Sequence, residues 1–126
     1  MKNDILSHFD LDGKVVAITA GGGDLCGAMA EALGTMGVKV AVLDIDMKKA
    51  ETRAFAVTGS GGTAKAFQCD VLDRGQVREC YEAVRNLWGP PDFLINGAGG
   101  NAPRATTSEE FHSPGGASTP ATQSFF

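Results

Sequence analysis

The sequence contains few of the residues that metal sites and disulfides require. Its three cysteines, Cys26, Cys69 and Cys80, are widely spaced and form no Cys-x-x-Cys pair. An odd number of scattered cysteines argues against a disulfide framework, so we expect reduced thiols, most of them buried. The two histidines, His8 and His112, lie far apart without the spacing of metal ligands. We therefore expect no metal site.

Long apolar runs and clusters of basic residues are also lacking. No stretch is long enough to span a membrane, and residues 1–13 carry no apolar core of a signal peptide. The net charge of -4 at pH 7 argues against a general nucleic-acid binder, which usually carries a basic patch. These absences predict a cytoplasmic protein that binds neither nucleic acid nor a membrane.

The composition of the sequence is that of a single globular domain. Its 126 residues are 43% hydrophobic and 21% charged, which suffices to bury a core. The clearest pattern begins at residues 15–18, an apolar run with three β-branched residues, which predicts a central strand covered on both faces.

A glycine triplet, Gly21 to Gly23, follows this strand. Glycines allow positive φ and leave no Cβ to obstruct an approaching anion. The next apolar residues recur at helical spacing and predict a helix buried along one side: Leu25, Ala28, Met29, Ala32, Leu33 and Met36. A glycine turn before a helix N-terminus can bind phosphate, although the glycines alone are equally explained by a flexible connection.

Asp44 ends a second predicted strand, residues 39–44, 24 residues after Ala20. Dinucleotide-binding folds place an acid at about 20 residues from the glycine turn, where it accepts hydrogen bonds from the adenosine ribose. A carboxylate there would repel a 2′-phosphate, so NAD is favoured over NADP. Capping of the next helix is the alternative for both Asp44 and Asp46; we favour ribose binding for Asp44 and capping for Asp46.

The remaining sequence continues this alternation. Residues 64–68 and 92–95 predict a third and a fourth strand, each preceded by a helix. The apolar positions of these two helices are Met47, Ala50, Ala54 and Val57 in the first, and Val77, Cys80, Tyr81, Val84, Leu87 and Trp88 in the second, which Asp73 caps. The order predicts an α/β fold, a Rossmann-like parallel sheet with helices on both faces. Ligands of such sheets bind beyond the carboxyl ends of the strands.

Four segments at these strand ends resemble the short-chain dehydrogenase/reductase family over about residues 10–100: Thr19-Ala-Gly-Gly-Gly, Asp44, Asp70-Val71 and Asn96-Gly-Ala-Gly. The resemblance implies that residues 1–100 are an NAD-binding Rossmann half-domain. It implies a pyrophosphate on the first loop, selection of NAD by Asp44 and adenine at Asp70-Val71. The cofactor-binding residues carried over are Thr19, Ala20, Gly21, Gly22, Gly23, Asp24, Leu25, Asp44, Asp70, Val71, Asn96, Gly97, Ala98 and Gly99.

Within this family, two segments look most like the D-mannonate oxidoreductase (fructuronate reductase) branch: Gly-Gly-Gly-Asp-Leu-Cys-Gly-Ala-Met-Ala and Asn-Gly-Ala-Gly-Gly-Asn. The loop departs from the family pattern, because Ala20, Asp24 and Cys26 replace three glycines. Asp24 is the most serious departure. As an N-cap, it would compete with a diphosphate for the helix N–H groups, so we expect replacement of Asp24 by Val to tighten cofactor binding.

The family's Tyr-x-x-x-Lys, in which the Tyr is the general acid/base, is absent. Tyr81 and Arg85 imitate its spacing, but Tyr81 lies on an apolar stripe, where packing is the better interpretation. No catalytic residue is assigned, and we expect this chain alone to be inactive.

Residues 101–126 are rich in Gly, Pro, Ser and Thr and read as an exposed loop that begins a missing second half, so we expect truncation after the fourth strand. The predicted function is that of a cofactor-binding fragment of an NAD-dependent oxidoreductase acting on a sugar acid such as D-mannonate or fructuronate. Complete family members are expected to be homo-oligomers. A non-catalytic nucleotide-binding or interaction module and a methyltransferase are the alternatives.

Overall fold

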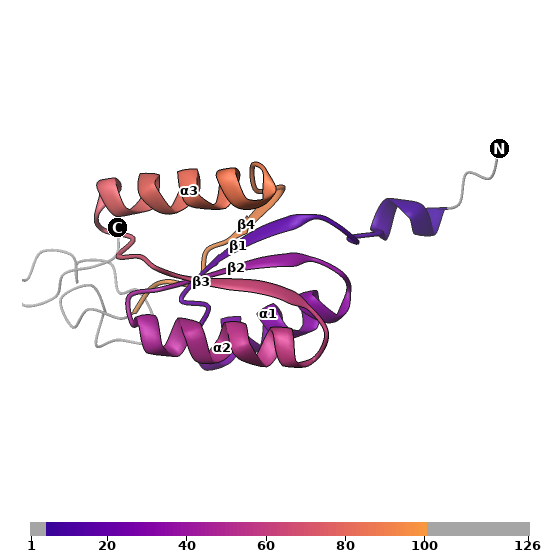
Figure 1. Cartoon of the computed structure of the whole chain (residues 1–126), viewed down its shortest axis with the longest axis horizontal. Coiled ribbons are helices and arrows are strands. Elements are labelled where there is room, and N and C mark those ends of the chain that lie inside the picture. Colours follow the sequence, from indigo (N-terminus) through magenta and orange to yellow (C-terminus); the bar gives the residue numbers. More distant parts are fainter. Residues whose placement is uncertain (1–4, 101–126) are drawn as a thin grey trace, which may run out of the picture.

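The computed structural model of the chain describes residues 5–100. Four strands form one sheet: β1 (Val15–Thr19), β2 (Lys39–Asp44), β3 (Thr63–Gln68) and β4 (Phe93–Ile95). The connecting helices are α1 (Asp24–Thr35), α2 (Met47–Gly59) and α3 (Arg74–Trp88). All strand pairs are parallel, and the order is β3-β2-β1-β4. Helices α1 and α2 cover one face and α3 the other, which confirms the predicted Rossmann-like sheet (Figure 1).

Strand β1 is central, as predicted, because it pairs with β2 on one side and β4 on the other. All five of its residues are buried, and so are five of the six residues of β2. Neighbouring residues of a strand point to opposite faces, so a strand covered on both faces needs an apolar side chain at nearly every position.

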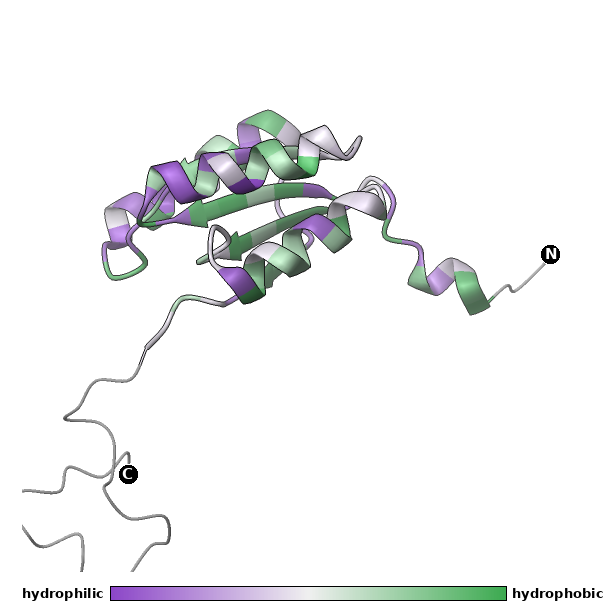
Figure 2. Cartoon of the chain, turned by 90° about the horizontal axis from the view of Figure 1, so that it is seen from below, coloured by the Kyte–Doolittle hydropathy of each residue, from purple (hydrophilic) through white to green (hydrophobic). Residues whose placement is uncertain are grey.

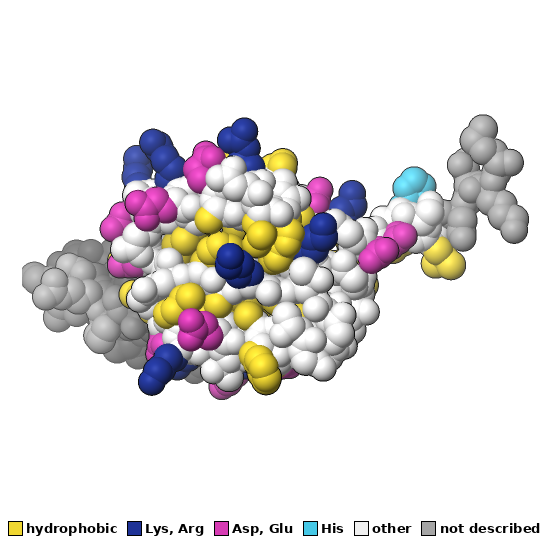
Figure 3. Space-filling view, viewed as in Figure 1, with side chains coloured by type: hydrophobic (Ala, Val, Ile, Leu, Met, Phe, Trp, Pro, Cys, Tyr) yellow, Lys and Arg dark blue, Asp and Glu magenta, His cyan; other side chains and the backbone are white. Residues whose placement is uncertain are grey.

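Two apolar layers result, one on each side of the sheet. The layer under α1 and α2 is built from Val16, Ile18, Val40, Val42, Ala30, Ala54 and Val57, among others. The layer under α3 contains Val15, Ala17, Ala41, Leu43, Cys69, Cys80 and Val84. Figure 2 shows the hydrophobic strands between the helices, and Figure 3 shows hydrophobic side chains on both sides of the sheet.

The predicted buried face of α1 is wrong, although the helix itself is where the pattern placed it. Leu25 and Met36 are 73% and 49% exposed, and Met29 is exposed as well. The buried residues are instead small: Cys26, Gly27, Ala30 and Gly34. A Cβ on Gly34 would lie 2.5 Å from Val57 Cγ1, so α1 and α2 can approach this closely only with a glycine between them. The period of the large apolar residues therefore gave the wrong face.

The other two helices follow the prediction more closely. Helix α2 buries Ala50, Ala54 and Val57. Helix α3 buries only Cys80 and Val84 of its six-residue stripe, while Val77, Tyr81 and Leu87 remain partly exposed. The side chain of Asp46 caps α2 and that of Asp73 caps α3, as expected.

The chain before β1 forms an exposed 3-10 helix, Ile5–Phe9, which projects away from the sheet (Figure 1). Strand β4 begins at Phe93, one residue later than predicted. Asp92, just before it, fastens this end of β4 to β1. The backbone N–H of Asp92 donates to the carbonyl of Val15 (2.8 Å), and its carboxylate accepts from the N–H of Val15 (2.7 Å). No helix within residues 5–100 combines the length and the apolar composition needed to cross a bilayer.

We expect Gly22→Ala to lower the free energy of unfolding by about 1–3 kcal/mol, the usual cost of forcing an atom into a packed site. The added Cβ would lie 2.7 Å from the backbone carbon of Lys49 and 2.9 Å from the nitrogen of Ala50. Gly59→Ala is the matched control, because nothing lies within 4 Å of its Cβ position; at the last residue of α2 it should raise the free energy of unfolding by less than about 1 kcal/mol. Urea unfolding measures both, and unchanged stability of Gly22→Ala would contradict the packing.

Candidate functional site

The four parallel strands end at the same edge of the sheet. Thr19 ends β1 and Asp44 ends β2, and both residues are buried. The segments that follow β3 and β4 contain Asp70-Val71 and residues 96–99. The structure therefore brings the residues singled out in the sequence to one edge, where open α/β sheets bind ligands.

The glycine triplet packs the turn after β1 against the protein itself. A Cβ on Gly21 would lie 2.9 Å from Val42 Cγ1, and one on Gly22 would meet the backbone of α2. None of the three glycines adopts the positive φ that glycine allows; the left-handed residue is Ala20, with φ 52°. An alanine in that conformation costs roughly 1–2 kcal/mol relative to its preferred region. Gly21 and Gly22 therefore allow the turn to pack closely against β2 and α2. The backbone strain lies at Ala20, one residue before the triplet.

Asp44 joins the glycine turn to the start of α2. The residue is only 9% exposed; its Oδ2 accepts from the N–H of Gly22 (3.1 Å) and its Oδ1 from the N–H of Asp46 (2.9 Å). Asp46, not Asp44, is the N-cap of α2 and accepts from the N–H of Lys49. A carboxylate has about four acceptor positions, so the Asp44 oxygens can also accept from ligand hydroxyls.

Asp24 is not an N-cap, which corrects the expectation from the sequence. Helix α1 begins at Asp24 itself, and its N-cap is Gly23; within residues 5–100 no side-chain cap bonds to this end of the helix. The carboxylate of Asp24 is exposed. In the part of the chain that the structure describes, the N–H groups at this end of α1 thus have no side-chain cap, and the charge of Asp24 opposes an anion there.

Thr19 fixes the segment that follows β4. Its hydroxyl accepts from the N–H groups of Gly97 (2.9 Å) and Ala98 (3.1 Å) and donates to the carbonyl of Ile95 (3.5 Å). A Cβ on Gly97 would lie 2.7 Å from the Thr19 carbonyl oxygen and would collide with the sulfur of Cys26. The predicted site residues Thr19, Gly97 and Ala98 thus already bind one another.

Asp70 organises the turn between β3 and α3. Its N–H donates to Gln76 Oε1 (2.9 Å), and its Oδ1 accepts from the N–H of Leu72 (3.0 Å). Val71 is exposed and lines a cavity of about 570 Å³ between α3 and the sheet. Thr19 and Asn96 line the same cavity, together with Leu43, Cys69, Cys80, Tyr81 and Phe93. The cavity wall is largely apolar, as is usual for small-molecule pockets.

The cysteines of the described residues are free and buried, as predicted. The sequence did not place two of them, Cys69 and Cys80, on the wall of this cavity. Burial and, to a smaller extent, the neighbouring Cys69 together raise the pKa of the Cys80 thiol to about 12. Cys80 Sγ donates to the carbonyl of Gln68 (3.4 Å). This thiol is therefore neutral at physiological pH and is a poor nucleophile.

Residues 5–100 contain no group of three His, Cys, Asp or Glu side chains that could hold a metal ion. His8 is exposed on the N-terminal 3-10 helix. His112 lies outside the described residues, as do residues 101–126 as a whole.

The fold and this edge of the sheet define an α/β protein of the Rossmann-like class. The sequence profile of the short chain dehydrogenase family matches residues 14–114. The chain therefore belongs to the short-chain dehydrogenase family, a family of oxidoreductases, as its sequence motifs indicated.

Two relatives are similar over most of this chain. An uncharacterized oxidoreductase of Haemophilus influenzae is 38% identical over 109 residues, which cover 86% of this chain and 38% of that protein. The uncharacterized oxidoreductase UxuB of Bacillus subtilis is 43% identical over 119 residues, covering 94% of this chain and 41% of the relative. The chain thus spans about two-fifths of the length of these relatives.

Solved structures with bound cofactor have the same fold. A putative D-mannonate oxidoreductase from Haemophilus influenza with bound NAD matches with a TM-score of 0.74 and 38% identity, covering 87% of this chain and 39% of that one. A xylitol dehydrogenase with bound NAD+ matches with a TM-score of 0.68 and 32% identity, covering 71% of this chain and 34% of the other.

The raised pKa of Cys80 predicts how stability changes with pH. The folded-state pKa of about 12 lies above the ordinary value of 9.0. The stability that comes from the neutral thiol is therefore fully present below about pH 9 and is lost as the pH rises toward 12, since only the unfolded chain ionises readily in that window. Urea unfolding at several pH values should show this loss, and Cys80→Ala should remove the part of the pH dependence that is due to this thiol.

Alkylation gives a second readout. Iodoacetamide at about pH 9 should label Cys80 in urea but not in the folded chain, because only the thiolate reacts. Labelling of the folded chain as fast as the unfolded one would contradict the burial of this thiol.

Proposed function

We propose that this chain forms the NAD-binding part of a short-chain dehydrogenase that oxidises or reduces a sugar acid such as D-mannonate or fructuronate. The observation that carries the proposal is the buried Asp44 carboxylate at the end of β2, bonded to the glycine turn that precedes α1. The D-mannonate oxidoreductase structure with bound NAD, 38% identical to this chain, supports both the cofactor and the substrate class.

The residues present fit such a cofactor. The first-turn N–H groups of α1 carry no side-chain cap and would hold the diphosphate. The oxygens of Asp44 would accept from the ribose hydroxyls, and Asp70 with Val71 would border the adenine. Residues 96–99, held by Thr19, would line the cofactor on the other side. The full proposed set is Thr19, Ala20, Gly21, Gly22, Gly23, Asp24, Leu25, Asp44, Asp70, Val71, Asn96, Gly97, Ala98 and Gly99.

When bound, NAD would accept or donate the hydride at its nicotinamide ring. Proton transfer is assigned to no residue of this chain, which has no Tyr-x-x-x-Lys. We therefore propose binding without turnover by the chain alone, with residues 1–100 as the binding domain. A non-catalytic nucleotide-binding module shares this expectation. The two proposals differ in what they predict for a full-length protein, in which this chain replaces the corresponding part of a relative. Only the oxidoreductase proposal predicts that such a protein transfers hydride between NAD and a sugar acid.

Asp44→Asn tests the proposed choice of NAD over NADP. Asparagine keeps one acceptor oxygen, for the N–H of Gly22, loses the acceptor for the N–H of Asp46, and removes the charge that would repel a 2′-phosphate. Calorimetric titration should show that NAD binds the wild-type chain at least about tenfold more tightly than NADP, and that this ratio falls toward one in the variant. An unchanged ratio would refute the role of Asp44, and equal binding of NADP by the wild-type chain would refute the proposed cofactor.

Asp24→Val should tighten NAD binding several-fold, because it removes a negative charge from the first turn of α1, where the diphosphate would lie. Asp24→Asn is the matched control for charge, since it preserves the shape of the side chain. Both variants should bind adenosine, which has no phosphate, as the wild-type chain does. The expectation fails if NAD affinity is unchanged or weaker in both variants.

A further inference from the structure

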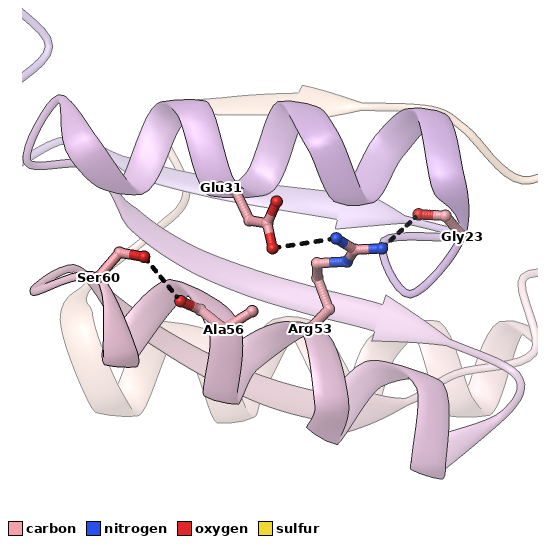
Figure 4. Close-up of polar contacts among 5 residues, drawn as sticks. All are labelled: Gly23, Glu31, Arg53, Ala56 and Ser60. Carbon is pink, nitrogen blue, oxygen red and sulfur yellow. Dashed lines mark hydrogen bonds and ion pairs between the residues drawn. The ribbon is translucent and has the colours of Figure 1, made fainter.

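Arg53 reaches from α2 across to the start of α1. Its Nη2 donates to the carbonyl of Gly23 (3.4 Å), and its Nη1 pairs with Glu31 Oε1 (3.1 Å) (Figure 4). The Arg53 side chain is only 22% exposed and that of Glu31 is 42% exposed. The guanidinium is thus bonded at both of its ends to α1 or its cap and is held in one place.

Residues four apart on a helix lie in a row on one face, and Gly23, Gly27 and Glu31 have this spacing. Arg53 lies along this row. Gly23 accepts a hydrogen bond from Arg53 with its carbonyl, and Glu31 pairs with Arg53 through its carboxylate. Gly27, between them, has no Cβ and leaves room for the guanidinium. A Cβ on Gly27 would collide with the guanidinium nitrogens and carbon of Arg53. The glycine at 27 is therefore explained by the arginine at 53.

The carbonyl that Arg53 holds belongs to the peptide unit between Gly23 and Asp24. The peptide unit is planar and trans, so its C=O and N–H point in opposite directions. The same carbonyl accepts from the N–H of Gly27 (2.9 Å), which aligns it with the helix axis. Fixing the carbonyl consequently aims the N–H of Asp24 out of the N-terminal end of α1, toward the proposed diphosphate.

We propose that Arg53 is a positioning residue for the diphosphate of the cofactor. It fixes the peptide unit between Gly23 and Asp24 and adds a positive charge beside it; this inference rests on the proposed function. A cation near a helix N-terminus is unfavourable while that end is empty, because the dipole there is also positive. The charge of Arg53 becomes favourable once an anion binds. An ion pair that only stabilised the fold would show no such dependence on a bound anion.

Arg53→Met tests this role, since methionine keeps much of the apolar length and removes the charge and the donors. Arg85→Met is the matched control: Arg85 pairs with Glu82 (3.4 Å) on the exposed side of α3 and has no contact with the glycine turn. Calorimetry on the full chain would compare NAD, ADP and adenosine. The variant should lose about tenfold affinity for NAD and ADP, as when one hydrogen bond to a charged group is lost, and less than about twofold for adenosine.

Comparing ligands with and without a diphosphate separates positioning of the diphosphate by Arg53 from a general effect of Arg53 on the stability of the fold. Arg53→Lys should recover part of the ADP affinity, because lysine keeps the charge without the planar pair of donors. Arg85→Met should bind all three ligands as the wild-type chain does. Equal losses for ADP and adenosine in Arg53→Met, or no loss for either, would overturn the proposal.

Amide hydrogen exchange tests the role of Arg53 without any ligand, so its result does not depend on whether the proposed function is correct. If the wild-type chain binds neither NAD nor ADP, the proposed function fails and the exchange measurement decides the role of Arg53 alone. Faster exchange of the Gly27 amide, which donates to the Gly23 carbonyl that Arg53 also holds, in Arg53→Met but not in Arg85→Met would support positioning of the turn. Equal rates in the two variants would overturn it.

Discussion

The buried carboxylate of Asp44 joins three segments at the edge of the sheet where the proposed site lies. It accepts from Gly22 in the turn after β1 and from Asp46 before α2, while it ends β2 itself. An ionised group this deeply buried is tolerated because backbone donors satisfy it. A carboxylate has about four acceptor positions, so these two bonds leave it able to accept from a ligand as well as to fasten the turn.

The packing of α1 depends on this fastened turn. The helix can lie close to α2 because it presents small residues inward, and Gly34 faces Val57 where any side chain would collide. The same closeness lets Arg53 reach the cap of α1 at Gly23. The stability of the fold and the proposed anion site therefore depend on the same face of α1. The strained residue Ala20 lies at the start of the glycine turn that precedes this helix.

Much of the fold could be predicted from the sequence because its strands are covered on both faces. Continuous β-branched runs, and caps such as Asp46 and Asp73, are local signals that the structure confirms. The inward face of α1 could not be predicted, because hydrophobic periodicity weighs large residues and this helix packs by small ones. Identifying Gly27 as a place for the guanidinium of Arg53 requires knowing how α2 lies against α1, and no local pattern contains that.

The most direct test of the account is to map by NMR which backbone amides of the full chain respond to NAD. The account predicts saturable changes at Gly22, Asp24 and Leu25, in the glycine turn and first turn of α1, and at the amides beside Asp44 and Val71. Residues on the outer side of α3, such as Glu82, should not respond. Changes spread along the cavity under α3 without any at the glycine turn would contradict the proposed cofactor site, as would the absence of saturable changes in a folded sample.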